Sequence, residues 1–107
     1  MNFIQPNSIK NIHKLSIAPM MDCTDRHFRM IMRKISSEAL LYTEMIVAKS
    51  LIYTDKKENF LNFNNEEHPI SIQFGGDDPI ILKEAAKMAQ NWGYDEINFN
   101  VGCPSPR

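Results

Sequence analysis

The stretch that best predicts the fold is Asp95-Glu96-Ile97-Asn98-Phe99-Asn100-Val101-Gly102-Cys103-Pro104-Ser105-Pro106-Arg107. Apolar residues alternate with Asn98 and Asn100 between positions 97 and 101, which is the period of a β-strand. Asparagines on one side of a strand are costly to bury unless they are hydrogen-bonded, and a ligand is one partner that can do this. The Gly-Cys-Pro turn should then present the thiol of Cys103 at the carboxyl end of the strand.

Three similar units precede this strand. Their strands are predicted at residues 15–18, 40–45 and 70–74, and helices should follow the first at about residue 24 and the second up to about residue 53. The third helix has complete start and stop signals, with Asp78 as N-cap, Pro79 in the first turn and Gly93 as C-cap. Residues 54–68 should form a polar loop, and residues 1–14 an irregular leader.

The first of these helices carries two patterns. One is an apolar stripe at helical spacing, which predicts a core-facing surface and consists of Phe28, Ile31, Met32 and Ile35. The other is basic and consists of Arg26, Arg29, Arg33 and Lys34. These basic residues could meet a nucleic-acid backbone, but a solvated surface is the more ordinary alternative.

The alternation of strands and helices, with about 27 residues per unit, favours parallel strands joined by crossover helices. An open doubly wound sheet and part of a (β/α)8 barrel both fit this order. No glycine-rich phosphate-binding motif follows the first strand, which counts against a dinucleotide-binding sheet. Unusual residues such as Glu44, a carboxylate at a strand end, gather at the carboxyl ends of strands, where barrel enzymes build their sites. We therefore predict an α/β fold: residues 15–107 as the N-terminal half of a (β/α)8 TIM barrel, with about four βα units.

Composition narrows the class of protein. The 107 residues are 43% hydrophobic and carry a net charge of −1, so the chain as a whole is not an electrostatic binder of nucleic acid. No apolar run approaches the roughly 18 residues of a membrane span, and the N-terminus does not resemble a secretory signal. We expect a cytoplasmic protein with reduced cysteines, of which Cys23 should only pack. The three histidines lack metal-ligand spacing, so no metal is expected.

Several segments resemble the tRNA-dihydrouridine synthases. Each is short, but they occur in order and with matching spacing: Ala18-Pro19-Met20-Met21-Asp22, Thr24-Asp25-Arg26, Leu41-Tyr42-Thr43-Glu44-Met45, Glu67-His68-Pro69, Gln73-Phe74-Gly75-Gly76-Asp77-Asp78-Pro79 and Gly93-Tyr94-Asp95-Glu96-Ile97-Asn98-Phe99-Asn100-Val101-Gly102-Cys103-Pro104-Ser105. Two runs look most like the DusA branch: Asp25-Arg26-His27 after the first strand and Tyr94-Asp95-Glu96-Ile97-Asn98 leading into the last strand. Members of that branch reduce uridines 20 and 20a in the D-loop of tRNA.

The resemblance implies an FMN-dependent reduction of the C5=C6 bond of uridine, with NADPH as reductant and tRNA as partner. In that chemistry hydride passes from the reduced flavin to C6, and an acid gives a proton to C5. Cys103 matches the proton-donating cysteine of the family. An ordinary thiol, with a pKa of about 8.5, is mostly protonated near neutral pH and is suited to that step.

The resemblance also implies a flavin site. Pro19, Met20 and Met21 match a turn that packs beside the flavin ring, where apolar contacts suit a flat ligand. Gln73 matches a residue that hydrogen-bonds the ring, and Asn100 matches a position that helps to place flavin and substrate.

The family also binds the flavin phosphate through later loops and grips tRNA with a C-terminal helical domain, neither of which occurs in this sequence. The chain therefore looks truncated, and we expect it to be inactive alone and monomeric. Two alternatives stay open at this point: a flavin barrel enzyme that acts on a free pyrimidine, and a non-catalytic remnant.

Overall fold

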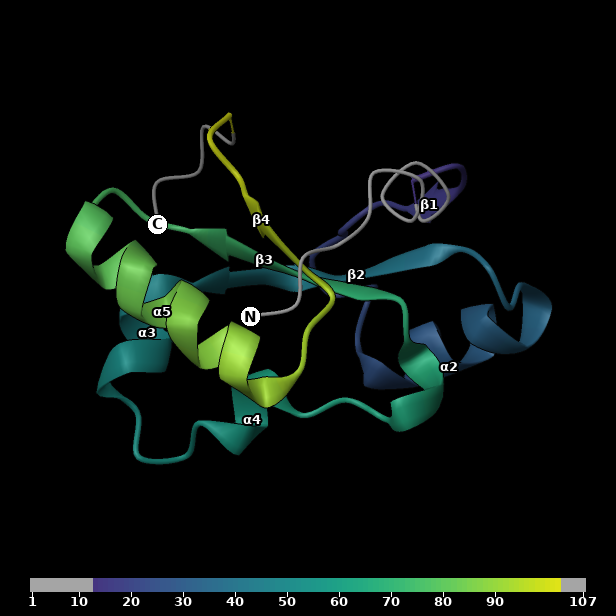
Figure 1. Cartoon of the computed structure of the whole chain (residues 1–107), viewed down its shortest axis with the longest axis horizontal. Coiled ribbons are helices and arrows are strands. Elements are labelled where there is room, and N and C mark those ends of the chain that lie inside the picture. Colours follow the sequence, from purple (N-terminus) through teal and green to yellow (C-terminus); the bar gives the residue numbers. More distant parts are fainter. Residues whose placement is uncertain (1–12, 103–107) are drawn as a thin grey trace.

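A computed structural model describes residues 13–102 as helices and strands in alternation (Figure 1). In chain order these are β1 (Ser16–Ile17), α2 (Arg26–Ile35), β2 (Leu40–Val47), α3 (Ala48–Tyr53), α4 (Glu58–Leu61), the 3-10 turn η1 (Asn65–Glu67), β3 (Ile70–Gly75), α5 (Pro79–Trp92) and β4 (Glu96–Phe99). The predicted strands and main helices are present. The predicted polar loop at 54–68 is wrong in part, because it contains α4 and η1.

The strands form one parallel sheet in the order β1-β2-β3-β4. A doubly wound sheet reverses its strand order at a switch point, whereas a barrel adds each new strand beside the one before it. The sequential order is therefore that of a (β/α)8 barrel. This confirms the predicted α/β fold with parallel strands, arranged as in the N-terminal half of such a barrel.

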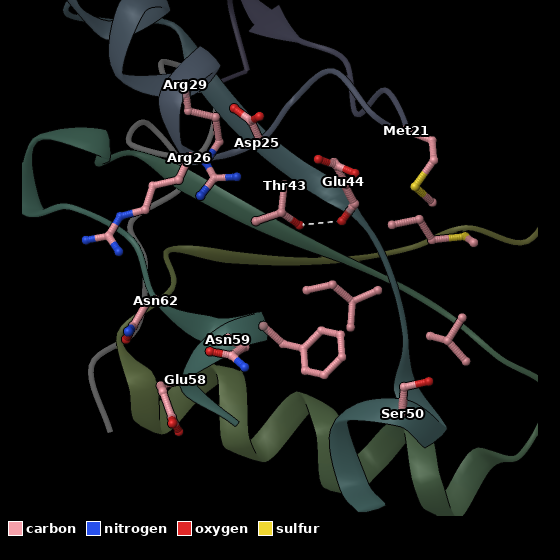
Figure 2. Close-up of a pocket in the computed structure, with 14 residues that line it drawn as sticks. Met21, Asp25, Arg26, Arg29, Thr43, Glu44, Ser50, Glu58, Asn59 and Asn62 are labelled. Atoms are coloured by element: carbon pink, nitrogen blue, oxygen red, sulfur yellow. Dashed lines mark hydrogen bonds between the residues drawn. The ribbon is translucent and has the colours of Figure 1, made fainter. Parts of the chain in front are cut away.

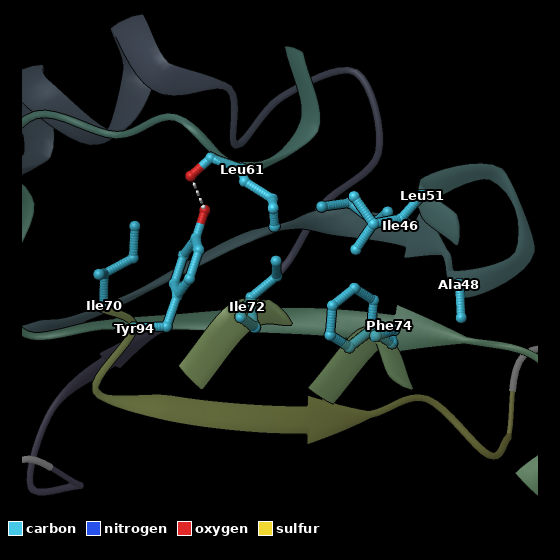
Figure 3. Close-up of a cluster of buried hydrophobic side chains, with 10 residues drawn as sticks. Ile46, Ala48, Leu51, Leu61, Ile70, Ile72, Phe74 and Tyr94 are labelled. Atoms are coloured by element: carbon cyan, nitrogen blue, oxygen red, sulfur yellow. Dashed lines mark hydrogen bonds between the residues drawn. The ribbon is translucent and has the colours of Figure 1, made fainter. Parts of the chain in front are cut away.

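The main hydrophobic core lies between the β2–β3 part of the sheet and the helices α3 and α5 (Figure 3). Ile72 and Phe74 on β3 and Leu51 on α3 are fully buried, as are Ala85 and Ala89 on α5. The small residues on α5 allow the helix to lie close to the sheet. This core is what fixes the orientation of β3, so the opposite face of that strand is left for polar side chains.

Helix α5 begins and ends where its sequence predicts. Asp78 accepts a hydrogen bond from the backbone N–H of Ile80 at 2.9 Å, and Pro79 is the first helical residue. Gly93 ends the helix with a φ of 110°, in the left-handed region that glycine enters without strain.

The prediction that the apolar stripe of α2 is core is wrong for two of its four residues, Ile31 and Ile35, whereas Phe28 and Met32 are half-buried. Ile31 and Ile35 are 60% and 72% exposed, whereas Arg29 and Arg33 on the other side are buried. Because these two arginines are buried, they form neither a solvated surface nor a surface that could meet a nucleic-acid backbone. The N-cap of α2 is Asp25, which accepts a hydrogen bond from the N–H of Phe28 at 2.8 Å.

The buried arginines bind the segment before β3. The Nε–H of Arg29 donates to Oε1 of Glu67, and the guanidinium of Arg33 donates to the carbonyl oxygens of Glu66, Glu67 and Pro69. Burial lowers the pKa of Arg33, and the nearby carboxylates, chiefly that of Glu67, oppose this effect. Charged side chains are buried only when they are paired in this way, so α2 packs through polar contacts instead of an apolar stripe.

No helix within residues 13–102 is both long and apolar enough to cross a membrane. The same residues contain no group of three or more His, Cys, Asp or Glu side chains placed to hold a metal ion.

Candidate functional site

The turn after β1 is tightly organised around Met20. The carbonyl oxygen of Met20 accepts hydrogen bonds from the backbone N–H groups of Cys23 and Thr24, at 3.1 and 2.9 Å. The N–H of Met20 donates in turn to the hydroxyl of Thr24, which is fully buried. The side chains of Met20 and Met21 stay 41% and 46% exposed. The turn therefore presents two apolar side chains to the outside on a rigid backbone.

Glu44 on β2 ties this turn to the sheet. Its Oε2 accepts a hydrogen bond from the N–H of Asp22 at 3.1 Å. Asp22 has a φ of 61°, in the left-handed region, which aspartate tolerates better than most residues. The sequence marks Glu44 as a carboxylate at a strand end, but only the structure shows that it fixes the Met20–Met21 turn.

Gln73 lies on the face of β3 away from the hydrophobic core. It is paired in register with Asn98 on β4, and its Nε2 donates to Oδ1 of Asn98 at 2.7 Å. The sequence indicates that a buried Asn98 needs a hydrogen-bond partner, and this partner is a neighbouring side chain. Met45 is the register partner of Gln73 on β2, so the three side chains form one layer across the sheet.

Gly75 lies at the end of β3, two residues after Gln73, and the side chain of Met45 packs against it. A Cβ atom on this residue would lie 2.7 Å from Sδ of Met45, closer than real contacts of this kind. The methionine therefore lies over the strand end.

Asn100 directly follows β4. Its N–H donates to the carbonyl oxygen of Phe74 at 2.9 Å, and its Oδ1 accepts from the N–H of Gly102 at 3.1 Å. The side chain thus closes a local turn two residues ahead, which is a common role of asparagine. Cys103, the predicted proton donor, lies outside the described residues.

A cleft of about 570 Å³ opens beside β2, between the N-terminal end of α2 and the α3–α4 segment (Figure 2). Of the predicted site residues that the structure describes, only Met21 lines it, together with Glu44 and Met45 from the second half of β2. Its rim is polar and of mixed charge, formed by Asp25, Arg26, Glu58, Asn59 and Asn62 among others. Gln73 and Asn100 are not part of its lining, so the predicted residues do not all meet in one cavity.

The predicted residues that the structure describes nevertheless share one edge of the sheet. Because the strands are parallel and adjacent in sequential order, the turn after β1 and the residues that end β3 and follow β4 lie at the same, carboxyl edge. Sequence reasoning missed Asn98 as the partner of Gln73 and missed Asn59 and Asn62 at the cleft. The asparagine of the strand was visible in the sequence; the cleft residues lay in a segment expected to be loop.

A comparison with protein families and known proteins gives a consistent result. Residues 16–107 match the family described as Dihydrouridine synthase (Dus). A protein of Synechocystis named tRNA-dihydrouridine(20/20a) synthase is 56% identical over 97 residues, which are 91% of this chain and 29% of that protein. Proteins of the same name are 52% identical in Xanthomonas campestris, over 88% of this chain and 28% of theirs, and 47% identical in Escherichia coli O6:H1, over 96% and 30%. The chain thus spans about 30% of the length of these relatives.

Proposed function

The chain belongs to the dihydrouridine synthase family, and from this we propose that the complete gene product reduces uridine to dihydrouridine in the D-loop of tRNA, at positions 20 and 20a. The observation that carries the proposal is the match of residues 16–107 to that family, together with the name shared by relatives that are 47–56% identical. Residues 15–107 are then the N-terminal portion of a barrel-shaped catalytic domain. The cellular setting proposed is the cytoplasm, and the oligomeric state a monomer.

FMN is the cofactor proposed, with NADPH as its reductant. The donor set at the sheet edge suits a flavin: Met20 and Met21 offer exposed apolar surface to a flat ring, on a backbone turn fixed by Thr24. Gln73 offers a neutral amide whose Oε1 makes no hydrogen bond within residues 13–102. When bound, FMN supplies the hydride that the uracil ring receives at C6.

The protein's own residues handle the proton and the orientation of the reacting groups. Gln73 fixes the flavin ring, and Pro19 and the two methionines that follow it hold its face. Cys103 holds the proton that C5 of the uracil receives. Asn100 helps to place flavin and substrate, and its Oδ1 accepts a hydrogen bond from the N–H of Gly102. A neutral thiol suits this step because it donates a proton without needing a strong acid.

The test uses the purified complete gene product and tRNA from a strain that lacks dihydrouridine synthases. Incubation with FMN and NADPH should yield dihydrouridine, which mass spectrometry of nucleosides detects as a gain of two hydrogens. Mapping of the modified nucleotides should place it at positions 20 and 20a. Reduction of free uracil or uridine with no reaction on tRNA would favour the free-pyrimidine alternative, and no reduction of either would reject the proposal.

A further inference from the structure

The contact between Gln73 and Asn98 fixes the direction of a side chain that the proposed mechanism uses. The two residues face each other across β3 and β4, and Nε2 of Gln73 lies 2.7 Å from Oδ1 of Asn98. Gln73 is 8% exposed and Asn98 is half-buried. A hydrogen bond shielded from water in this way resists rotation of the amide more than an exposed one does.

A carboxamide has two distinct ends, one oxygen that accepts and one nitrogen that donates. In the structure Asn98 accepts from Nε2, so the nitrogen end of Gln73 lies on the β4 side. The oxygen end is then turned away from Asn98, and within the described part of the chain it accepts no hydrogen bond. Rotation of this amide by half a turn would exchange an acceptor for a donor at the same place.

We propose that Asn98 is a positioning residue, which orients the carboxamide of Gln73 so that Oε1 faces the bound ligand as an acceptor. The inference rests on the proposed function, in which Gln73 contacts the ring of FMN. The oxidised isoalloxazine ring carries a single N–H donor, on its pyrimidine portion, and an outward-facing Oε1 is the group that recognises it. A wrongly rotated amide would place N–H groups against N–H.

Two substitutions separate the role of the acceptor from the role of the side chain's size. Asn98→Asp keeps an oxygen that can only accept, so it should preserve the orientation of Gln73. Asn98→Leu has a similar size and no acceptor. Asn91→Leu, on the exposed surface of α5, is the matched control. Each variant of Asn98 is made both with Gln73 present and in a Gln73→Ala background.

FMN affinity of the complete gene product, stripped of flavin and titrated by fluorescence, is the first readout. Asn98→Leu should weaken binding by about five- to tenfold, the usual effect of one hydrogen bond, while Asn98→Asp stays within about threefold of the parent. In the Gln73→Ala background, Asn98→Leu should cost no more than about a further twofold, because its effect passes through Gln73. The control should bind like the parent.

Three results would overturn the inference. The first is unchanged FMN affinity in Asn98→Leu. The second is a loss in Asn98→Asp as large as that in Asn98→Leu, together with equally fast exchange of the Gln73 amide protons in both variants, since an acceptor at residue 98 would then not hold Gln73. The third is an equal loss with and without Gln73, which would mean that Asn98 contacts the flavin directly or acts through the stability of β4.

A ligand-free readout keeps the inference separate from the proposed function. In NMR spectra of the flavin-free protein, the side-chain amide protons of Gln73 should exchange slowly in the parent and in Asn98→Asp, and faster in Asn98→Leu. Failure of the parent to bind FMN would reject the proposed cofactor while this measurement still decides the role of Asn98. Equal exchange rates in all three proteins would reject that role.

Discussion

Arg29 and Glu67 form an ion pair inside the protein, with Nε of the guanidinium 2.5 Å from Oε1 of the carboxylate and side chains that are 6% and 0% exposed. The other oxygen of Glu67 accepts the backbone N–H of Asn64, which caps the η1 turn. One carboxylate therefore joins α2 to the segment that leads into β3. This relationship carries the first prediction.

Glu67→Ala should lower the free energy of unfolding by about 3–5 kcal/mol, because it leaves Arg29 charged, buried and without its partner. Glu67→Gln keeps the shape and should cost less. Urea unfolding of the complete gene product, followed by circular dichroism, measures the free energy of unfolding of both variants. Glu66→Ala, at an exposed neighbour, is the control, and its free energy of unfolding should change by no more than about 0.5 kcal/mol. A change in Glu67→Ala no larger than that in the control would show that the pair contributes nothing.

Tyr94 should make stability depend on alkaline pH. Its hydroxyl donates to the carbonyl oxygen of Leu61 at 2.8 Å, and burial raises its pKa well above the ordinary value near 10. Above pH 10 the unfolded chain loses the phenolic proton while the folded chain keeps it. The free energy of unfolding should then fall as pH rises, by at most about 1.4 kcal/mol per pH unit from this group.

Tyr94→Phe tests this dependence. Urea unfolding of the complete gene product at pH 8, 10 and 11 should show that the free energy of unfolding falls less with rising pH in the variant than in the parent. At pH 8 the variant should be less stable by about 1–3 kcal/mol, because the carbonyl of Leu61 loses its donor. Tyr42, whose pKa is raised by burial and then by Glu96, titrates in both proteins and cancels in the comparison. Parallel pH profiles would contradict the assignment.

Gln73→Ala should weaken the binding of FMN to the complete gene product several-fold to tenfold. The variant loses a hydrogen bond to a neutral partner, which is worth about 0.5–1.5 kcal/mol. Fluorescence titration measures the affinity, and Gln90→Ala on the exposed side of α5 is the control. Equal affinity of the two variants would remove Gln73 from the flavin site.

Cys103→Ala should leave FMN binding and reduction of the flavin by NADPH nearly intact, since neither step needs the thiol. Formation of dihydrouridine should fall by about 10²–10⁴-fold, the usual contribution of a positioned acid. The loss should appear in turnover more than in tRNA affinity. Nucleoside mass spectrometry after single-turnover reactions measures it, with Cys23→Ala as the control cysteine. Parental rates in Cys103→Ala would make the thiol structural.

Residues 1–107 expressed by themselves should be poorly soluble and should not bind FMN. Within the described residues, β1 and β4 are each paired along one side only, and Val101 beyond β4 is 97% exposed. Open strand edges and exposed apolar residues favour aggregation. Absorption spectroscopy of the soluble fraction checks this, and a soluble yellow protein would contradict it.

The sequence by itself determined the elements whose signals are local. The caps of α5 at Asp78 and Gly93 depend on backbone groups within one turn of the helix, so residue type alone predicts them. The alternation of strands and helices likewise predicts parallel strands, because a crossover helix between strands permits little else. The turn at Met20 and the end of β3 at Gly75 followed from the same rules.

Only the tertiary structure decided how α2 packs and what Gln73 contacts. An apolar stripe marks a buried face when the neighbouring surface is apolar, but α2 faces Glu67, which is 38 positions away from Arg29 in the chain. A charged partner at that distance reverses which side of the helix is buried. Gln73 and Asn98 are 25 residues apart and meet because strand register sets them opposite each other. Such pairings depend on the relative placement of whole strands, which no local pattern of residues contains.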